Sequence, residues 1–468
     1  MFFYGPLGSV INLTFNEKMK STLLLAMAFL MLSGIGYAQK SAVQKILPYP
    51  IFQKKLANGL NVVTVPYNSP GLAAFYIVIR AGSRDEIEPG KTGFAHFFEH
   101  MMFRGTDKFP SDKYSAILKS TGASANANTS LDRTIYHMTG NAGKLETMFE
   151  IEGDRFQNLK YSVQDFKTEA GAVKGEYTKN SASPFVQLNE KIAETAFKAH
   201  TYGHTTMGYF KDVVDMPNQY DYSLEFFKRF YRPEYATIIV VGDVASDKVN
   251  ALAEKYFGNW KKGDYVSKIP FEEAQTETRY THIQLKGFPP LLTLNYKGPS
   301  FNDQQIDMPA LDVLSSLLFS EKSDLYKKLV LDEQKVRFIQ AGATDSRDPN
   351  LFNIYASVVN AADMQYVKDE IVKALEDAKI NKVPAQLLAD TKSNLKYSFA
   401  MSIDNPTSIA ESLSHYVYLT GDPESLNRLY ALYDKVSTQD LVNVAQKYFV
   451  PTGLTIGTIS PADSVDVK

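Results

Sequence analysis

The chain has 468 residues, 44% of them hydrophobic, and a formal net charge of −2 at pH 7. This length and composition suffice for two ordinary domains with their own cores, while the near-neutral charge excludes a broad basic surface for nucleic acid. Because the sequence contains no cysteine, it excludes disulfides, thiolate metal ligands and a cysteine nucleophile. A metal site would have to use histidines and carboxylates.

The N-terminal residues have the pattern of a secretory signal. A basic start is followed by a short apolar run at 23–32 and by small residues up to Ala38. The sequence therefore predicts a signal peptide over 1–38, with Met19 as an alternative start. The apolar run is short for a membrane span, so no stable span is expected after cleavage. In a cell with two membranes, the mature protein would work in the periplasm.

Beyond this leader, the first half mixes strands and helices. Alternating or apolar runs predict strands, and apolar residues at helical spacing predict helices. The expected strands are 60–65, 73–79 and 135–139, and the expected helices are 112–121, 144–157, 164–179 and 184–199. This mixture predicts an α+β fold.

Two histidines four residues apart, with a glutamate between them, form the most informative motif. His96, Glu99 and His100 share one helical sector of roughly 100°, while the phenylalanines between them point elsewhere to pack. Imidazoles one turn apart suit tetrahedral Zn²⁺, which at a catalytic site also needs a third protein ligand and an open position. The order His-x-x-Glu-His is the inverzincin signature, with Glu99 placed to act as general base.

The helix expected at 164–179 offers the third ligand. Glu169 and Glu176 are seven residues apart and face the same way, and small residues around them allow a neighbouring backbone to approach. We assign Glu176 as the third ligand, and Glu169 as a group that orients a ligand or tunes its charge. The alternative is that His96 and His100 are ordinary core histidines and the glutamates lie on a solvated helix face.

The second half repeats the plan of the first without the metal motif. A polar, irregular stretch at 261–276 predicts a linker, and we place the domain boundary between residues 265 and 266. Beyond it we expect a strand at 291–296 and helices at 307–319, 363–380 and 384–399. The helix at 307–319 is apolar where the first half has its ligands. The region 266–468 is therefore expected to be a catalytically silent copy of 39–265.

Three further features have structural interpretations. His200 and His204 are expected to serve the fold rather than the chemistry. The segment 400–420 fits either the lining of a chamber or ordinary core, and we expect core.

The chain resembles the pitrilysin/insulysin family of zinc metallopeptidases over nearly its whole mature length. Beyond the zinc motif and Glu176, the segments 81–86, 93–96, 103–106 and 122–136 fit the family. The resemblance implies two homologous domains, each an antiparallel-rich sheet packed against helices, as in mitochondrial processing peptidases. It also implies one Zn²⁺ per chain, and an edge strand at Asn126 and Ala127 that binds peptide substrates through its main chain.

The resemblance weakens in the second half. Relatives carry there an arginine and a tyrosine that help to bind substrate, whereas this chain has Asp324 at the place of the arginine and no plain match for the tyrosine around Phe338. Short members of the family pair with another chain. The resemblance therefore implies a homodimer, or a heterodimer with a related subunit that supplies the missing groups.

The expected function is hydrolysis of oligopeptides or small unfolded proteins by a zinc-activated water, with Glu99 as the base. The alternative is a zinc-containing subunit of a peptidase assembly that needs a partner chain for activity, or a peptide-binding subunit. Asp324 favours this alternative. The intact Glu99 favours the enzyme, because a purely structural zinc site needs no general base.

Overall fold

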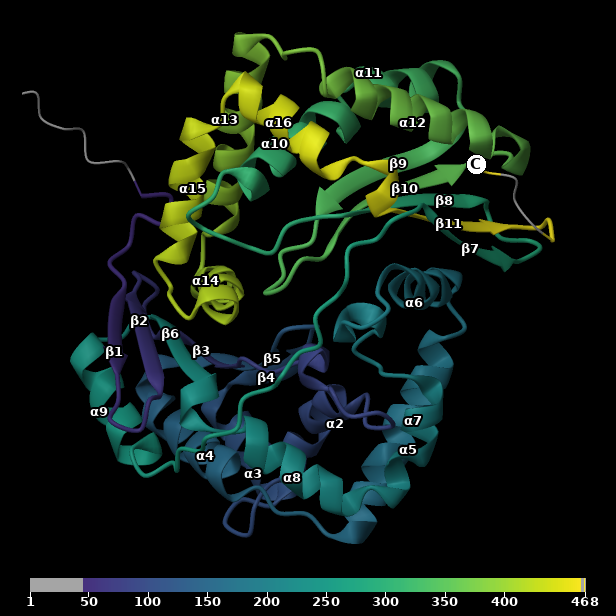
Figure 1. Ribbon diagram of the computed structural model, residues 1–468. Helices are drawn as coiled ribbons and strands as arrows, with labels where there is room; N and C mark the ends of the chain where they lie inside the picture. Colours follow the sequence, from purple (N-terminus) through teal and green to yellow (C-terminus); the bar gives the residue numbers. More distant parts are fainter. Residues whose placement is uncertain (1–44, 464–466, 468) are drawn as a thin grey trace, which may run out of the picture. The chain divides into compact units, whose positions relative to one another are not determined.

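The computed structural model describes residues 45–463 and 467, so the predicted signal peptide at 1–38 lies outside the described residues. Two β-sheets, one in each half of the chain, are packed against helices (Figure 1). This confirms the α+β fold. No helix in the described ranges is long and apolar enough to cross a membrane.

The first sheet has six strands in the order β1-β2-β6-β3-β5-β4. β2 and β6 are parallel and all other neighbours are antiparallel. The strands are β1 (Phe52–Lys55), β2 (Asn61–Pro66), β3 (Leu72–Ile79), β4 (Ser124–Thr129), β5 (Thr134–Asn141) and β6 (Ala236–Gly242). β4 is an edge strand, so one side of its backbone has no partner strand in the described part of the chain.

The second sheet repeats this arrangement with five strands in the order β7-β11-β8-β10-β9. β7 and β11 are parallel, and the remaining pairs are antiparallel. The strands are β7 (Arg279–Gln284), β8 (Leu291–Lys297), β9 (Val336–Ala343), β10 (Leu351–Val358) and β11 (Leu454–Ser460). Apart from the extra β1, strand order and direction match those of the first sheet. The expected repeat is therefore confirmed, whereas the boundary between residues 265 and 266 stays a prediction.

The helices expected in the first half are present close to their predicted bounds, and three more follow them that the sequence did not predict. In chain order they are α2 (Phe94–Met101), α3 (Ser111–Thr121), α4 (Leu145–Asn158), α5 (Val163–Asn180) and α6 (Pro184–Ala196), followed by the unpredicted α7 (Phe210–Asp215), α8 (Tyr220–Phe230) and α9 (Ser246–Phe257). The expectation of a helix up to residue 199 is wrong by three residues. Phe197 has extended backbone angles, and its buried ring packs with the core residues of α6.

In the second half, helix α10 begins and ends at the residues that the sequence predicted. The set is α10 (Asp307–Phe319), α11 (Asp324–Tyr326), α12 (Met364–Ala378), α13 (Ala385–Ser402), α14 (Pro406–Thr420), α15 (Ser425–Lys435) and α16 (Thr438–Tyr448). α14 begins with an Asn405 cap and Pro406, and ends at Gly421 in the left-handed conformation. Its buried apolar side chains, with Ile403 before it, belong to the core that the second half forms with the first sheet. This confirms the expectation of core for most of 400–420, whereas Met401 is 61% exposed.

Successive residues of the first sheet enter two different cores, because side chains alternate along a strand. Val62 and Ile77 pack in the core that includes α2, α4 and α8. Their neighbours Val63 and Val78 pack in the core formed with the second half. Figure 1 shows the corresponding layers, with α14 on one side of the sheet and α2, α4 and α8 on the other.

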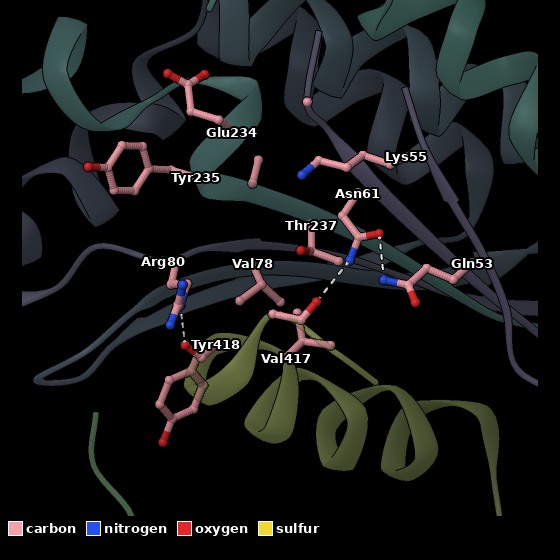
Figure 2. A pocket seen from close by; sticks show the side chains of 13 residues that line it. Gln53, Lys55, Asn61, Val78, Arg80, Glu234, Tyr235, Thr237, Val417 and Tyr418 are labelled. Carbon is pink, nitrogen blue, oxygen red and sulfur yellow. Dashed lines mark hydrogen bonds between the residues drawn. The ribbon is translucent and has the colours of Figure 1, made fainter. Parts of the chain in front are cut away.

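Each sheet is contacted by a helix from the other half of the chain. α14 contacts β3 and β6, and α6 contacts β11 and β7. At the end of α14, Arg80 donates hydrogen bonds to the carbonyls of Tyr418 (2.7 Å) and Leu419 (3.0 Å), which a helix C-terminus leaves without internal partners. Figure 2 shows the bond from Arg80 to Tyr418 among the residues that line a polar hollow of about 430 Å³. This exchange joins the halves into one compact unit over Lys45–Lys468.

Candidate metal centre

The helix that carries the histidine motif begins at a buried carboxylate. Glu86 accepts hydrogen bonds from the backbone N–H groups of Gly93 (2.8 Å) and Ala95 (2.7 Å), which are free at the N-terminus of α2. Burial raises the pKa of Glu86 to about 8, although these two hydrogen bonds oppose the rise. The start of α2 is therefore fixed by a residue outside the motif.

The loop that follows α6 packs directly on this helix start. A Cβ atom at Gly208 would lie 2.6 Å from the backbone nitrogen of Gly93, so the close approach requires glycine. His204 lies in the same loop, with Nδ1 3.9 Å from the Glu86 carboxylate, and His200 Nε2 lies 2.9 Å from Asp348. Both histidines are buried in structural contacts, as expected.

The donor atoms of the three predicted ligands lie close together. The Nε2 atoms of His96 and His100 are 3.3 Å apart, and Glu176 Oε2 lies 3.6 Å from the first and 3.3 Å from the second. Tetrahedral zinc with metal–ligand distances of about 2.0–2.2 Å requires ligand atoms about 3.3–3.6 Å apart. The donor triangle therefore fits Zn²⁺, and no other such cluster occurs among the described residues.

α5 brings Glu176 to α2 through an aromatic contact and a small buried residue. The helix starts at a Ser162–Asp165 capping box. Phe166 packs against Phe97 of α2, with ring centres 5.0 Å apart, and Ala170 is buried. The expected close approach at the glycines is wrong for Gly171 and Gly175, since both face open space.

Glu169 connects His100 to a cation. His100 Nδ1 lies 3.0 Å from Glu169 Oε1, and Arg104 Nε donates to Glu169 Oε2 at 2.6 Å. A carboxylate at Nδ1 holds the ring in the tautomer whose Nε2 lone pair faces the metal position. The contact is compatible with the orienting role expected for Glu169, which stays a prediction.

The environments of the two histidines shift their pKa values in opposite directions. Burial, aided by the neighbouring His100, lowers the pKa of His96 and favours the neutral ring that binds metals. The hydrogen bond that His100 donates to Glu169 raises the pKa of His100. Burial would raise the pKa of Glu169, but His100 and Arg104 lower it, so the carboxylate stays charged.

Glu99 lies beside the donor triangle and lines an open hollow of about 360 Å³ together with His100. The Thr129 hydroxyl at the end of β4 donates to Glu99 Oε2 at 2.7 Å and fixes the carboxylate. Asn126 of the same edge strand lines the hollow, whereas Ala127 is only 7% exposed and points into the core. Ala127 can therefore meet a substrate only through its main chain.

Sequence reasoning missed three supporting residues. Glu86, Arg104 and Thr129 lie within segments that fit the family pattern. The bonds of Arg104 to Glu169 and of Thr129 to Glu99 join residues far apart in the chain, whereas Glu86 bonds to the start of α2 within nine residues. Thr129 lies in the segment 122–136 that fits the family, and this was the only signal for it. No periodic pattern in the sequence indicated a role for any of the three residues.

The two positions of the second half that depart from the family pattern, Asp324 and Phe338, are both exposed. Asp324 is exposed at the first turn of α11. Phe338 lies on the edge strand β9 and is 37% exposed.

Comparison with known families identifies both halves of the chain. Residues 62–209 match the family model described as insulinase (peptidase family M16), and residues 219–395 match the one described as the peptidase M16 inactive domain. Together the two matches cover more than half of the chain.

Curated relatives align over most of the chain. Zinc protease PqqE of Helicobacter pylori (strain ATCC 700392 / 26695) is 29% identical over 424 residues, which are 87% of this chain and 92% of the relative. The probable mitochondrial-processing peptidase subunit beta of Arabidopsis thaliana is 25% identical over 432 residues, 87% of this chain and 77% of the relative.

Solved structures share the fold. A protease from Helicobacter pylori superposes with a TM-score of 0.82 at 27% identity, over 88% of this chain and all of that one. The first half of the periplasmic protease PqqL from Escherichia coli superposes with a TM-score of 0.71 at 20% identity, over 88% of this chain and 92% of that one, a likeness of fold alone. Since the two family matches together cover more than half of the chain, the chain belongs to peptidase family M16, the insulinase family, in its short two-domain form.

Proposed function

We propose that this protein is a zinc-dependent endopeptidase that hydrolyses oligopeptides or small unfolded proteins. The observation that carries the proposal is the donor triangle of His96, His100 and Glu176, whose sides of 3.3–3.6 Å suit one tetrahedral zinc ion. The name of the Helicobacter pylori relative, a zinc protease, supports this choice of metal and reaction.

The proposed mechanism divides the work between the metal and two carboxylates. Zinc, when bound, supplies the Lewis acidity that activates water and polarises the scissile carbonyl. Glu99 takes a proton from the attacking water and passes it to the nitrogen of the leaving amine. Thr129 holds one oxygen of Glu99, so the other remains free for this transfer. Glu169 keeps His100 in the orientation that binds the metal.

The substrate would bind as an additional strand on β4. Its outer edge lies open in the described chain, and Asn126 on this strand lines the hollow that contains Glu99. Pairing through main-chain hydrogen bonds accepts varied side chains, which suits a peptidase that acts on extended chains.

The test compares the full chain with Glu99→Gln. Both proteins are expected to bind one zinc ion, whereas cleavage of a quenched mixed-peptide library should fall about 10²–10⁴-fold in Glu99→Gln. Glu321→Gln, which changes an exposed glutamate of the second half, serves as the matched control and should keep full activity. A chelator should abolish cleavage and added Zn²⁺ should restore it. Normal cleavage by Glu99→Gln would end the proposed mechanism.

A second candidate is a zinc-containing subunit that needs a partner chain. Asp324 at the position where relatives carry a substrate-binding arginine favours it, and the Arabidopsis thaliana relative is itself named a subunit. This candidate predicts zinc binding without cleavage by the isolated chain, and activity when a related chain is co-purified. A monomer in light scattering with full peptidase activity would exclude both a homodimer and a heterodimer as requirements.

We also propose that the mature protein works outside the cytoplasm. The support is the leader pattern at 1–38. N-terminal sequencing of the protein from a periplasmic fraction is expected to give a start near Gln39. An intact leader on the active protein would contradict the proposal.

A further inference from the structure

A lysine amine without a hydrogen-bond partner lies at a second hollow of the molecule. Lys297 ends β8, and its buried Nζ atom has neither a hydrogen-bond partner nor a carboxylate within 4.0 Å among residues 45–463. The contact it does make is with the Phe197 ring, whose centre is 3.5 Å away. A cation–π contact offsets only part of the free energy lost when an ammonium group leaves water, so a further partner is expected.

The charged groups around Lys297 do not form a hydrogen bond with its amine. Burial lowers the pKa of Lys297 to about 8; Glu272 opposes this shift and Arg279 adds to it. Glu272 is already bound by the backbone N–H groups of Lys198, Ala199 and His200, at 2.8–3.0 Å. Arg279 donates to two carbonyls at the end of α6. Glu272 is thus bound by the backbone rather than by Lys297, and the guanidinium of Arg279 has no acceptor to offer, so the Lys297 amine stays without a partner.

The hollow beside Lys297 has a volume of about 410 Å³ and mostly apolar walls. It shares no lining residue with the hollow beside Glu99. Part of its wall comes from the irregular stretch between the two sheets, where Phe271 is 83% exposed. The apolar lining consists mainly of Phe197, Ile269, Pro270, Phe271, Pro349 and Val450.

The polar hollow at the end of α14 provides a useful contrast. There the Arg80 guanidinium donates to two helix carbonyls, and the walls carry amide, hydroxyl and charged groups (Figure 2). The chain itself supplies partners to that cation. At Lys297 it supplies apolar walls and an unpaired donor, the combination that marks a small-molecule site.

We propose that this second hollow binds a carboxylate carried on an apolar body. The ligand carboxylate would accept a hydrogen bond from Lys297 Nζ, and its apolar part would pack against the walls. Glu272 and Asp348 line the same hollow, so a single negative charge is favoured over a doubly charged phosphate. Two sources have this chemistry: a fatty acid, and the C-terminus of a peptide that ends in an apolar residue.

Calorimetric titration tests the proposal on the full chain carrying Glu99→Gln, so that no peptide is cleaved. The probes are octanoate, acetyl-alanyl-phenylalanine with a free carboxylate, and the same dipeptide as its C-terminal amide. At least one carboxylate is expected to bind with a Kd below about 1 mM, and the amide at least about tenfold more weakly. Binding of octanoate alone assigns the fatty acid, and binding of the acid dipeptide assigns the peptide C-terminus. Absence of binding by both carboxylates overturns the proposal.

A matched pair of variants locates the binding. Lys297→Met should weaken the carboxylate at least about tenfold, because a charged hydrogen bond is lost while the apolar stem is kept. Lys268→Met removes an exposed lysine from the same irregular stretch and should leave the affinity unchanged. Equal weakening by both variants would indicate only a general charge effect and overturn the site. The comparison of acid with amide uses no change at Lys297, so it stands even if Lys297→Met does not fold.

Discussion

Two helix pairs occupy equivalent places in the two halves, and only one of them can bind a metal. The pair in the first half is α2 and α5, and the pair in the second half is α10 and α13. The two helices of each pair are in contact. Counted from the helix starts, His96 and His100 of α2 correspond to Pro309 and Val313 of α10. The second half thus keeps the scaffold and replaces the ligands with apolar residues.

The partner helices also differ, but there hydroxyl residues replace the carboxylates. α5 and α13 each have 18 residues, and the places of Glu169 and Glu176 are taken by Thr391 and Ser398. Thr391 donates its hydroxyl to the Leu387 carbonyl of its own helix instead of binding a neighbour. The comparison teaches that the fold positions four side chains but does not decide their chemistry.

The largest expected effect is at Glu176. Glu176→Gln should weaken zinc binding by more than about 100-fold and reduce cleavage to near background, because a neutral amide replaces a charged ligand. Ser398→Ala, at the equivalent place on α13, should change neither quantity. A zinc competition titration and the peptide assay measure both. Unchanged zinc affinity in Glu176→Gln would remove it from the ligand set.

In the second half, α10 should matter for stability instead of metal binding. Leu311 of α10 is 0% exposed, so Leu311→Ala should lower the free energy of unfolding by about 2–5 kcal/mol. With chelator present, Glu176→Gln should change it far less, because that side chain is 37% exposed. Urea unfolding with chelator separates the two. If both variants lowered the free energy of unfolding equally, the helix pair α2 and α5 would also contribute to the stability of the core.

A smaller effect is expected at Arg104. Arg104→Ala frees Glu169 and loosens its hold on His100, which should weaken zinc binding about 10-fold. Arg104→Lys keeps one charged donor and should recover part of the affinity. Because Arg104 acts through Glu169, the unfolding transition measured with chelator should move little. A large shift there, with unchanged zinc affinity, would assign Arg104 a structural role only.

The smallest effect is expected at Thr129. Thr129→Val removes the donor to Glu99 with almost no change in shape and should lower kcat about 2–10-fold. Zinc content should stay the same, and Thr129→Ser should restore the rate. A change in zinc content rather than in kcat would place the hydroxyl's influence on the metal ligands instead of the base.

Local patterns determined much of this protein. The helical spacing of His96, Glu99 and His100 places them on one face whatever surrounds them, and α10 has the bounds that its apolar pattern predicted. The two homologous halves were also readable, since each repeats a strand, loop and helix order. These features depend on residues close together in the chain.

Tertiary structure decided the rest, because contacts between distant residues leave no periodic trace in a sequence. The expected packing at Gly171 and Gly175 failed since helix spacing gives relative directions but not which face meets a neighbour. The exchange of α6 and α14 between the sheets, the Arg104–Glu169–His100 chain and the Thr129–Glu99 bond likewise arise only on folding. The sequence determined the ligand types on each helix, and the packing of α5 against α2 decided that His96, His100 and Glu176 meet at distances that fit one zinc ion.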